Sequence, residues 1–448
     1  MTAKRILAFL IAITMLALSS CSHGFGNDLP YESSLKLTKA ENDGNYIAPS
    51  GDNSGIMLLS ALSEASEKGM EPNDEFSAAI GRSAFDYFGA AVEDGKTKEN
   101  ILISPLSIYI ALAMTACGAE GETLSQMQSV LGDVSIEEAA HCLYALGAEL
   151  TASEKIKLGL ANSVWVRDDK DMIQVNPDFV GVMNDYFSAD AFMAQFDDGT
   201  LRDINNWIEG KTDGMIKEML DDIPADAVMY LINALVFEAD WKDPYERTQL
   251  RDSKFTLHSG EKIDAELMYG SEDYYLEDDN AKGFIKPYAD SRYAFVALLP
   301  DEGTDVYDYA ASLTGERFAE LLDSKRRAIV ETAMPQFSYE YDDSLVNELM
   351  SLGMTDAFNG TDADLTGLGT SSMGNLYISD VLHKTFIEVS PKGTKAGAAT
   401  VVEVKCEGAV EIIDAERYQV YLDRPFVYAI TDLETGTPIF LGLLANPE

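Results

Sequence analysis

The order of helical and strand-like patterns along the chain restricts the folds open to it. From Asn73 to about residue 210, apolar residues recur at helical spacing, and Ser104-Pro105 and Asn176-Pro177 each predict a helix start, since serine or asparagine caps a helix and proline fits its first position. Beyond residue 228 the pattern changes to short apolar or alternating runs that predict strands, at residues 228–237, 293–299, 328–333, 386–389, 426–431 and 439–444. Helices first and strands later, without regular alternation, indicate an α+β fold.

Two local signals refine this expectation. Thr123 and Gln126 have the spacing of a capping box and predict a helix that closes at Gly132. Residues 434–436 separate the last two apolar runs and contain a glycine, so the chain should end in a buried hairpin.

The charge of the chain excludes several classes of partner. Its 448 residues include 33 Lys and Arg against 76 Asp and Glu, a formal net charge of -43, while 46% of residues are hydrophobic. That apolar share is enough for a large core. So acidic a surface repels phosphate backbones and anionic lipid headgroups, so we expect no nucleic-acid partner and no electrostatic binding to membranes.

Cysteine and histidine are too sparse for metal chemistry. The four cysteines form no CxxC pair and the four histidines no HExxH pair. We therefore expect no metal site, no cofactor and no disulfide scaffold.

The N-terminus predicts export. Lys4-Arg5 precede an apolar stretch at residues 6–18, and Leu18-Ser19-Ser20-Cys21 follows, which is the pattern of a secretory signal. This ending resembles the bacterial lipoprotein box, in which the cysteine is lipidated; an ordinary signal peptide is the alternative. We expect a signal peptide at residues 1–20, a lipid on Cys21 and a flexible tether at 21–72. Together these predict an exported lipoprotein, at the cell surface or anchored in the membrane, that faces the extracellular side.

Residues 390–424 do not have the pattern of an ordinary element. Read with period two, one face of the stretch is small and mostly apolar while the other becomes charged, which suits a strand buried on one side. Its glycines and alanines are poor strand formers, and Pro391 and Gly408 flank it as breakers. The stretch is therefore either a conditional strand or a flexible loop followed by an edge strand.

With this segment included, the chain resembles the serpins over roughly residues 75–447. Residues 388–400 look like the hinge of the serpin reactive-centre loop, and residues 423–430 with 435–442 look like the family's C-terminal signature. Further matches occur in family order at residues 100–107, 233–237 with Trp241, 352–358, 363–367 and 383–384. The resemblance implies one domain at residues 73–448, with three β-sheets, about nine helices and an exposed reactive-centre loop at about 390–420.

The function implied by the resemblance is suicide inhibition rather than catalysis. A serine endopeptidase, or a cysteine-type one, would cut the exposed loop and form an acyl-enzyme. The loop would then insert as a central strand of the large sheet and trap the protease. The alternatives are a non-inhibitory serpin that acts as a binding protein and, much less favoured, a hydrolase. We expect a monomer whose partner is the target protease.

The resemblance also implies roles for particular residues. The hinge comprises Gly393, Thr394, Lys395, Ala396, Gly397, Ala398, Ala399 and Thr400, with the even-numbered positions facing inward on the inserted strand. Ser104, Ser107, Asn233 and His383 match the shutter, the polar cluster beneath the two strands that part. Trp241 matches the breach, where insertion begins, and is equally compatible with ordinary core. For His383 the rival interpretation is a general base.

The resemblance also predicts the position of the scissile bond, and the chain departs from the family pattern at Pro391. The usual loop length places the reactive bond at Glu407–Gly408, but the loop is longer than usual, so the bond lies between residues 404 and 414, with Val404, Lys405 and Cys406 beside it. Cys406 is either incidental or makes inhibition redox-sensitive. Pro391 replaces the usual glutamate, and because proline fixes φ we expect it to alter how the hinge bends without abolishing inhibition.

Overall fold

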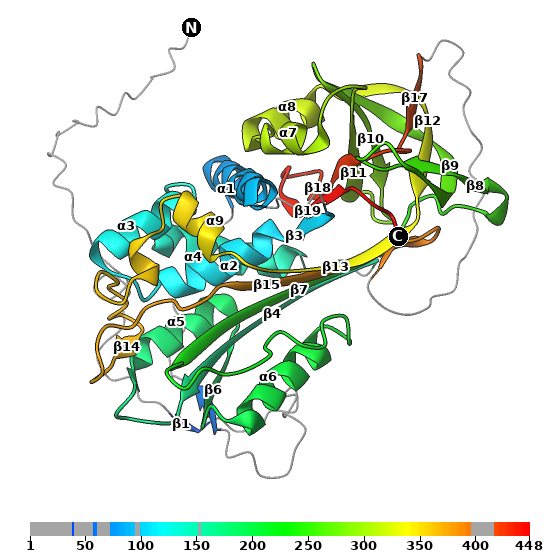
Figure 1. Cartoon of the computed structure of the whole chain (residues 1–448). Coiled ribbons are helices and arrows are strands. Elements are labelled where there is room, and N and C mark those ends of the chain that lie inside the picture. Colours follow the sequence, from blue (N-terminus) through cyan, green and yellow to red (C-terminus); the bar gives the residue numbers. More distant parts are fainter. Residues whose placement is uncertain are drawn as a thin grey trace, which may run out of the picture.

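The computed structural model describes residues 72–94, 99–150, 153, 155–395 and 416–448, together with two short strands at 38–39 and 57–60. These residues form an α+β fold with nine α-helices and three β-sheets (Figure 1), as predicted. Within the described part, no helix combines the length and apolar character needed to span a bilayer.

The helices begin where the local sequence caps them. Ser104 accepts a hydrogen bond from the backbone N–H of Ser107 and precedes an almost wholly buried helix, and Asn176 accepts one from Asp178 N in the same way. Both predicted helix starts are therefore confirmed. The helices are α1 (Asp74–Asp94), α2 (Pro105–Ala116), α3 (Gly121–Val130), α4 (Ile136–Leu150), α5 (Pro177–Phe187), α6 (Asp198–Lys211), α7 (Val306–Ala311), α8 (Gly315–Asp323) and α9 (Val346–Ser351), with 3₁₀ turns η1 (Arg247–Gln249) and η2 (Asp356–Phe358).

The capping box predicted for the third helix is wrong. Helix α3 begins at Gly121, two residues before Thr123, and its N-cap Glu120 makes no side-chain cap. Thr123 Oγ1 instead accepts from Asp364 N, and Gln126 Oε1 accepts from the backbone N–H of Asp356. Both side chains thus join distant parts of the chain rather than the helix end.

The large sheet takes strands from both halves of the sequence. Its order is β1 (Thr38–Lys39), β2 (Met57–Ser60), β6 (Asp190–Ala194), β4 (Ile156–Arg167), β7 (Met229–Asp240), β16 (Gly393–Lys395), β15 (Leu382–Val389) and β13 (Phe337–Ser344). Strands β4, β6 and β13 were not predicted, although β13 alternates aromatic and polar residues at its start. The short strand β16 lies between β7 and β15, with which it pairs antiparallel.

The second sheet holds the end of the chain. Its order is β17 (Arg417–Tyr421), β12 (Arg326–Pro335), β9 (Lys262–Glu277), β10 (Ala281–Pro287), β11 (Tyr293–Pro300), β18 (Phe426–Asp432), β19 (Pro438–Leu444) and β3 (Ile101–Ile103), with β8 (Leu250–Thr256) beside β9. The predicted C-terminal hairpin is confirmed as β18 and β19. The third sheet is the pair β14 (Gly369–Thr370) and β5 (Gln174–Val175).

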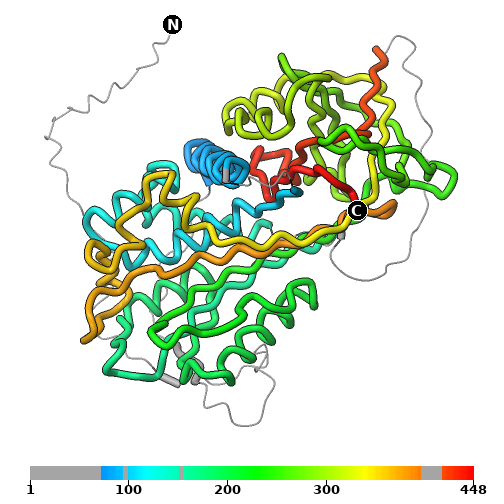
Figure 2. Tube along the Cα trace, in the orientation of Figure 1, coloured from blue at the N-terminus to red at the C-terminus, as the bar shows by residue number. Residues whose placement is uncertain are grey.

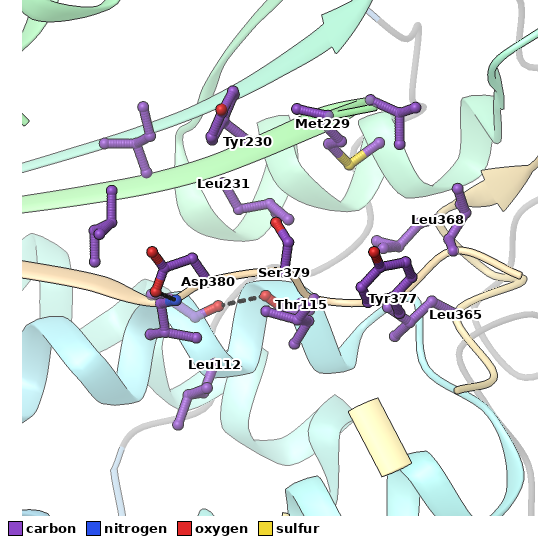
Figure 3. Close-up of a pocket in the computed structure, with 18 of the residues that line it drawn as sticks. Leu112, Thr115, Met229, Tyr230, Leu231, Leu365, Leu368, Tyr377, Ser379 and Asp380 are labelled. Atoms are coloured by element: carbon purple, nitrogen blue, oxygen red, sulfur yellow. Dashed lines mark hydrogen bonds between the residues drawn. The ribbon is translucent and has the colours of Figure 1, made fainter. Parts of the chain in front are cut away.

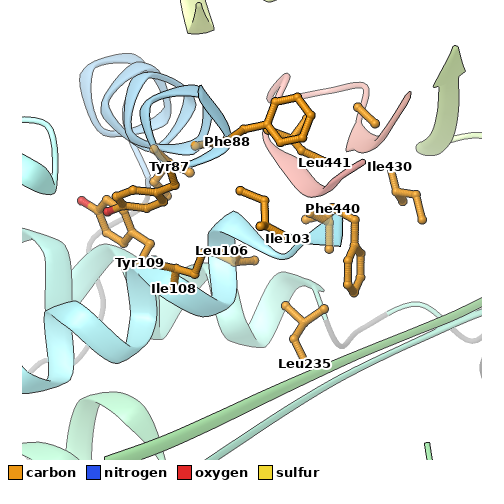
Figure 4. Packing of buried hydrophobic residues seen from close by; sticks show 14 of the residues in the cluster. Tyr87, Phe88, Ile103, Leu106, Ile108, Tyr109, Leu235, Ile430, Phe440 and Leu441 are labelled. Carbon is orange, nitrogen blue, oxygen red and sulfur yellow. The ribbon is translucent and has the colours of Figure 1, made fainter. Parts of the chain in front are cut away.

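Helix α2 lies in the core, in contact with the early helices α1, α3 and α4 and with the last strand, β19. The tube in Figure 2 shows α1, at the start of the described chain, beside the C-terminal strands, and α1 contacts β19. In Figure 4, Leu106 and Ile108 of α2 lie between Tyr87 of α1 and Leu235 of β7. Because α2 is apolar all round, it can be buried on every side and still support the large sheet.

Candidate functional site

The hinge forms a tight hairpin at one end of the large sheet. Strand β15 ends at Val389, residues 390–392 make the turn, and β16 begins at Gly393, with Ser390 N donating to Gly393 O at 2.9 Å. Gly393 pairs with Asp240 of β7, and a Cβ at this position would lie 2.1 Å from Ala239 O. Only glycine therefore allows the hinge to lie this close to β7.

Pro391 occupies the second position of this turn, counted from Ser390. Proline is favoured there because its ring presets φ. Its carbonyl oxygen accepts a hydrogen bond from Tyr245 N at 2.8 Å. The residue that departs from the family pattern is thus part of the anchored turn.

A five-residue segment after β7, which we call the cradle segment (residues 241–245), holds this turn. Trp241 N donates to Lys392 O at 2.8 Å and Trp241 Nε1 donates to Ser390 O at 2.9 Å. The indole of Trp241 is buried and stacks on Tyr288, with ring centroids 4.6 Å apart. Trp241 therefore holds the turn that precedes the hinge residues.

Thr394 is already buried in the sheet. Its Oγ1 shares a 2.6 Å hydrogen bond with Tyr288 OH, and it is 3% exposed. Tyr288 was not predicted as a site residue, because a tyrosine that ends an apolar run resembles ordinary core. The inward orientation of Thr394 agrees with the face that the alternating pattern assigns to it.

The four residues assigned to the shutter meet at the first turn of α2. Ser104 N donates to His383 Nε2 at 3.0 Å, which links α2 to β15. Ser107 Oγ donates to Asn233 Oδ1, which links α2 to β7. The side-chain amide of Asn233 continues to Asn162 Oδ1 on β4 at 2.6 Å. One helix end therefore binds the two strands that flank β16 through separate hydrogen bonds.

His383 is a neutral acceptor in this cluster. Burial lowers its pKa to about 4, although Asp342 opposes that shift. Its Nε2 receives the Ser104 N–H, a contact that requires an unprotonated nitrogen. This environment favours the structural interpretation of His383 over the general-base one.

A cavity of about 350 Å³ is lined by residues of β7, of α2 and of the segment 376–384. It lies farther along β7 than the part that pairs with β16. Figure 3 shows Met229, Leu231, Leu112 and Tyr377 among the side chains that line it. Across the described residues, β7 and β15 are joined only through β16. The cavity therefore occupies the part of the sheet into which a longer β16 would run.

The register of β16 against β7 predicts where a longer β16 would lie. Thr394 pairs with Ala239 in antiparallel order, and the same register would place Thr400 opposite Asn233, Val402 opposite Leu231 and Val404 opposite Met229. Residues directly opposite in an antiparallel pair face the same side of the sheet. All three would therefore face α2 and the cavity.

Several predicted site residues lie outside the described part of the chain. These are hinge residues 396–400, the reactive-bond region at 404–408 and Cys21, while Lys395 is placed only by its backbone pairing with Glu388. Among the described residues, no group of three or more His, Cys, Asp or Glu side chains is placed to hold a metal ion.

Comparison with known proteins agrees with this architecture. The family model described as serpin (serine protease inhibitor) matches residues 78–447. Human leukocyte elastase inhibitor is 28% identical over 390 residues, covering 84% of this chain and 100% of that protein. The crystal structure of the thermophilic serpin tengpin in its native state has a TM-score of 0.79 and 42% identity, over 86% of this chain and 97% of tengpin.

Thyroxine-binding globulin in complex with thyroxine also has this fold. Its TM-score is 0.71 at 22% identity, over 83% of this chain and 99% of that one. The three-sheet fold agrees with both structural matches. The chain belongs to the serpin family.

Proposed function

We propose that this protein is an inhibitor of serine endopeptidases that traps its target by inserting the cleaved loop between β7 and β15. The observation that carries the proposal is β16: Gly393 and Thr394 already pair with β7, and Thr394 and Lys395 pair with β15. The cavity beyond them is lined by apolar side chains opposite the positions that Val402 and Val404 would take. A small hinge and a hydrophobic acceptor site favour insertion, since each added residue gains backbone hydrogen bonds and buried area.

The test compares two neighbouring substitutions of the same chemistry. Ala398→Glu places a carboxylate on the inward face, opposite Leu235 in the β16 register, whereas Ala399→Glu places it on the outward face. We expect the wild-type protein and Ala399→Glu to form complexes with elastase-, trypsin- or subtilisin-like proteases that resist SDS. Ala398→Glu should be cleaved without trapping, because an unpaired carboxylate costs far more to bury than a neutral polar group does.

Two results would refute insertion. Equal trapping by both variants would show that the even-numbered face is not buried. Cleavage of the wild-type protein by every protease, without a complex and without a gain in thermal stability, would favour the alternative function of a binding protein. N-terminal sequencing of the C-terminal fragment would place the reactive bond relative to Glu407–Gly408 and to the range 404–414.

We also propose that Cys21 carries the membrane anchor and that the domain faces outward. The support is the sequence pattern at residues 1–21. Partition of the protein into a detergent phase, abolished by Cys21→Ala, is the expected result. An unchanged partition would exclude the anchor.

A further inference from the structure

A buried ion pair lies behind the cradle segment. Lys286 of β10 and Glu272 of β9 lie 2.8 Å apart, Nζ to Oε1, with side chains 3% and 7% exposed. Charges are seldom buried unless their position matters, because desolvation offsets much or all of the attraction between them. Neither the sheet pairing nor the shutter uses this pair.

Lys286 contacts the cradle segment at three residues. Its Nζ donates to Asp243 O at 3.3 Å and lies 4.3 Å from the centroid of the Tyr245 ring and 5.3 Å from that of Trp241. An ammonium group against aromatic faces is attracted by their quadrupoles, more so in a desolvated site. The pair therefore fixes the backbone and both rings of the segment.

The far side of the cradle segment holds the hinge turn. Its backbone N–H groups at Trp241 and Tyr245 donate to Lys392 O and Pro391 O, and the Trp241 indole donates to Ser390 O. All three carbonyl oxygens of the turn thus accept hydrogen bonds from a segment whose other side rests on Lys286. A continuous set of contacts runs from Glu272 through Lys286 and the cradle segment to the start of β16.

We propose that Lys286 and Glu272 are positioning residues for loop insertion: they hold the cradle segment against the hinge turn and so set the fraction of cleaved inhibitor that traps its protease. This inference rests on the proposed function. Insertion competes with hydrolysis of the acyl-enzyme, so a turn held ready for insertion lowers the number of inhibitor molecules consumed per protease trapped. A loosened turn slows insertion and raises that number.

The titratable groups around the pair give the proposal a pH signature. Three neighbours on other elements act on Glu272: Lys286 of β10, and Asp243 and Tyr245 of the cradle segment. Asp273, the next residue of β9, adds its charge. Burial raises the pKa of Glu272 above its ordinary value, with Lys286 opposing the shift and the two aspartates adding to it. Acidification therefore neutralises Glu272 earlier than an exposed glutamate and leaves Lys286 without its partner.

The test uses the double variant Lys286→Met/Glu272→Met, which removes both charges together and so leaves no uncompensated buried charge. We expect its stoichiometry of inhibition to rise several-fold and to depend less on mild acidification than that of the wild type. Arg317→Met is the control, since it breaks a partly buried ion pair with Asp278, outside the cradle segment and the hinge. A double variant with wild-type stoichiometry and pH profile would overturn the proposal.

A second measurement separates this proposal from the function on which it rests. Hydrogen exchange at the amides of Trp241 and Tyr245 reports their bonds to the hinge turn without any protease. We expect faster exchange there in the double variant and unchanged exchange in Arg317→Met. If no protease is trapped but exchange responds as stated, the proposed inhibition fails while the hold of the ion pair on the hinge turn stands; if exchange is unchanged, the positioning role fails.

Discussion

Protonation of His383 should weaken the native state, and His383→Gln should remove that effect. In the unfolded chain the histidine has an ordinary pKa of 6.5, while burial in the shutter lowers it to about 4. Because folding lowers the pKa of His383, this residue does not destabilise the native state above pH 6.5. The free energy of unfolding then decreases as the pH falls from 6.5 towards 4. At about 1.4 kcal/mol per pKa unit the full loss is about 3 kcal/mol. Glutamine retains an acceptor for Ser104 N but does not titrate.

The assay is a double difference. The free energy of the first urea transition is measured by tryptophan fluorescence at about pH 7.5 and about pH 4.5 for each protein, so that carboxylates that titrate in both proteins cancel. The wild type should lose about 2–3 kcal/mol more than His383→Gln over this interval. His258→Gln, which removes a histidine outside the shutter, serves as the control. A double difference below about 0.5 kcal/mol would refute the assignment of His383 as a buried neutral acceptor.

Three further substitutions test the geometry of the opening. Gly393→Ala should displace β16, because the added Cβ would lie 2.1 Å from a backbone oxygen, and should raise hydrogen exchange in the hinge turn; Gly81→Ala, whose Cβ meets nothing within 4 Å, should leave exchange unchanged. Ser107→Ala should lower the unfolding free energy by about 1–3 kcal/mol, since the buried Asn233 loses its donor; an unchanged urea midpoint would contradict this. Trp241→Phe removes the indole donor to Ser390 O while keeping an aromatic ring, and should increase exchange at Tyr245; equal exchange would show that the indole bond does not hold the turn.

Local signals predicted the parts of the fold that depend on neighbours in sequence. The caps at Ser104 and Asn176 and the final hairpin follow from short-range chemistry, and all three occur as expected. Thr123 and Gln126 have the spacing of a capping box, yet they bond to residues 364 and 355–356. The same side chains can satisfy a helix end or a distant backbone, and sequence spacing does not distinguish between the two.

Only those site residues that belong to the family's sequence motifs could be predicted. The motif matches identified Ser104, Ser107, Asn233 and His383, and the structure brings these residues together. Lys286 and Glu272 were not predicted, because nothing local shows that two charged residues on neighbouring strands meet in the interior. Tyr288 was missed for the related reason that its hydroxyl partner, Thr394, lies 106 residues away.

The position of β18 and β19 determines what proteolysis of the loop does to the molecule. Both strands are buried throughout, lie between β11 and β3, and follow β17, which pairs in parallel with β12. A cut anywhere between residues 404 and 414 would therefore yield two polypeptides that remain one particle, since the shorter one supplies interior strands of the second sheet. Native mass spectrometry or gel filtration would register no loss of mass, and only a denaturant would separate the fragments.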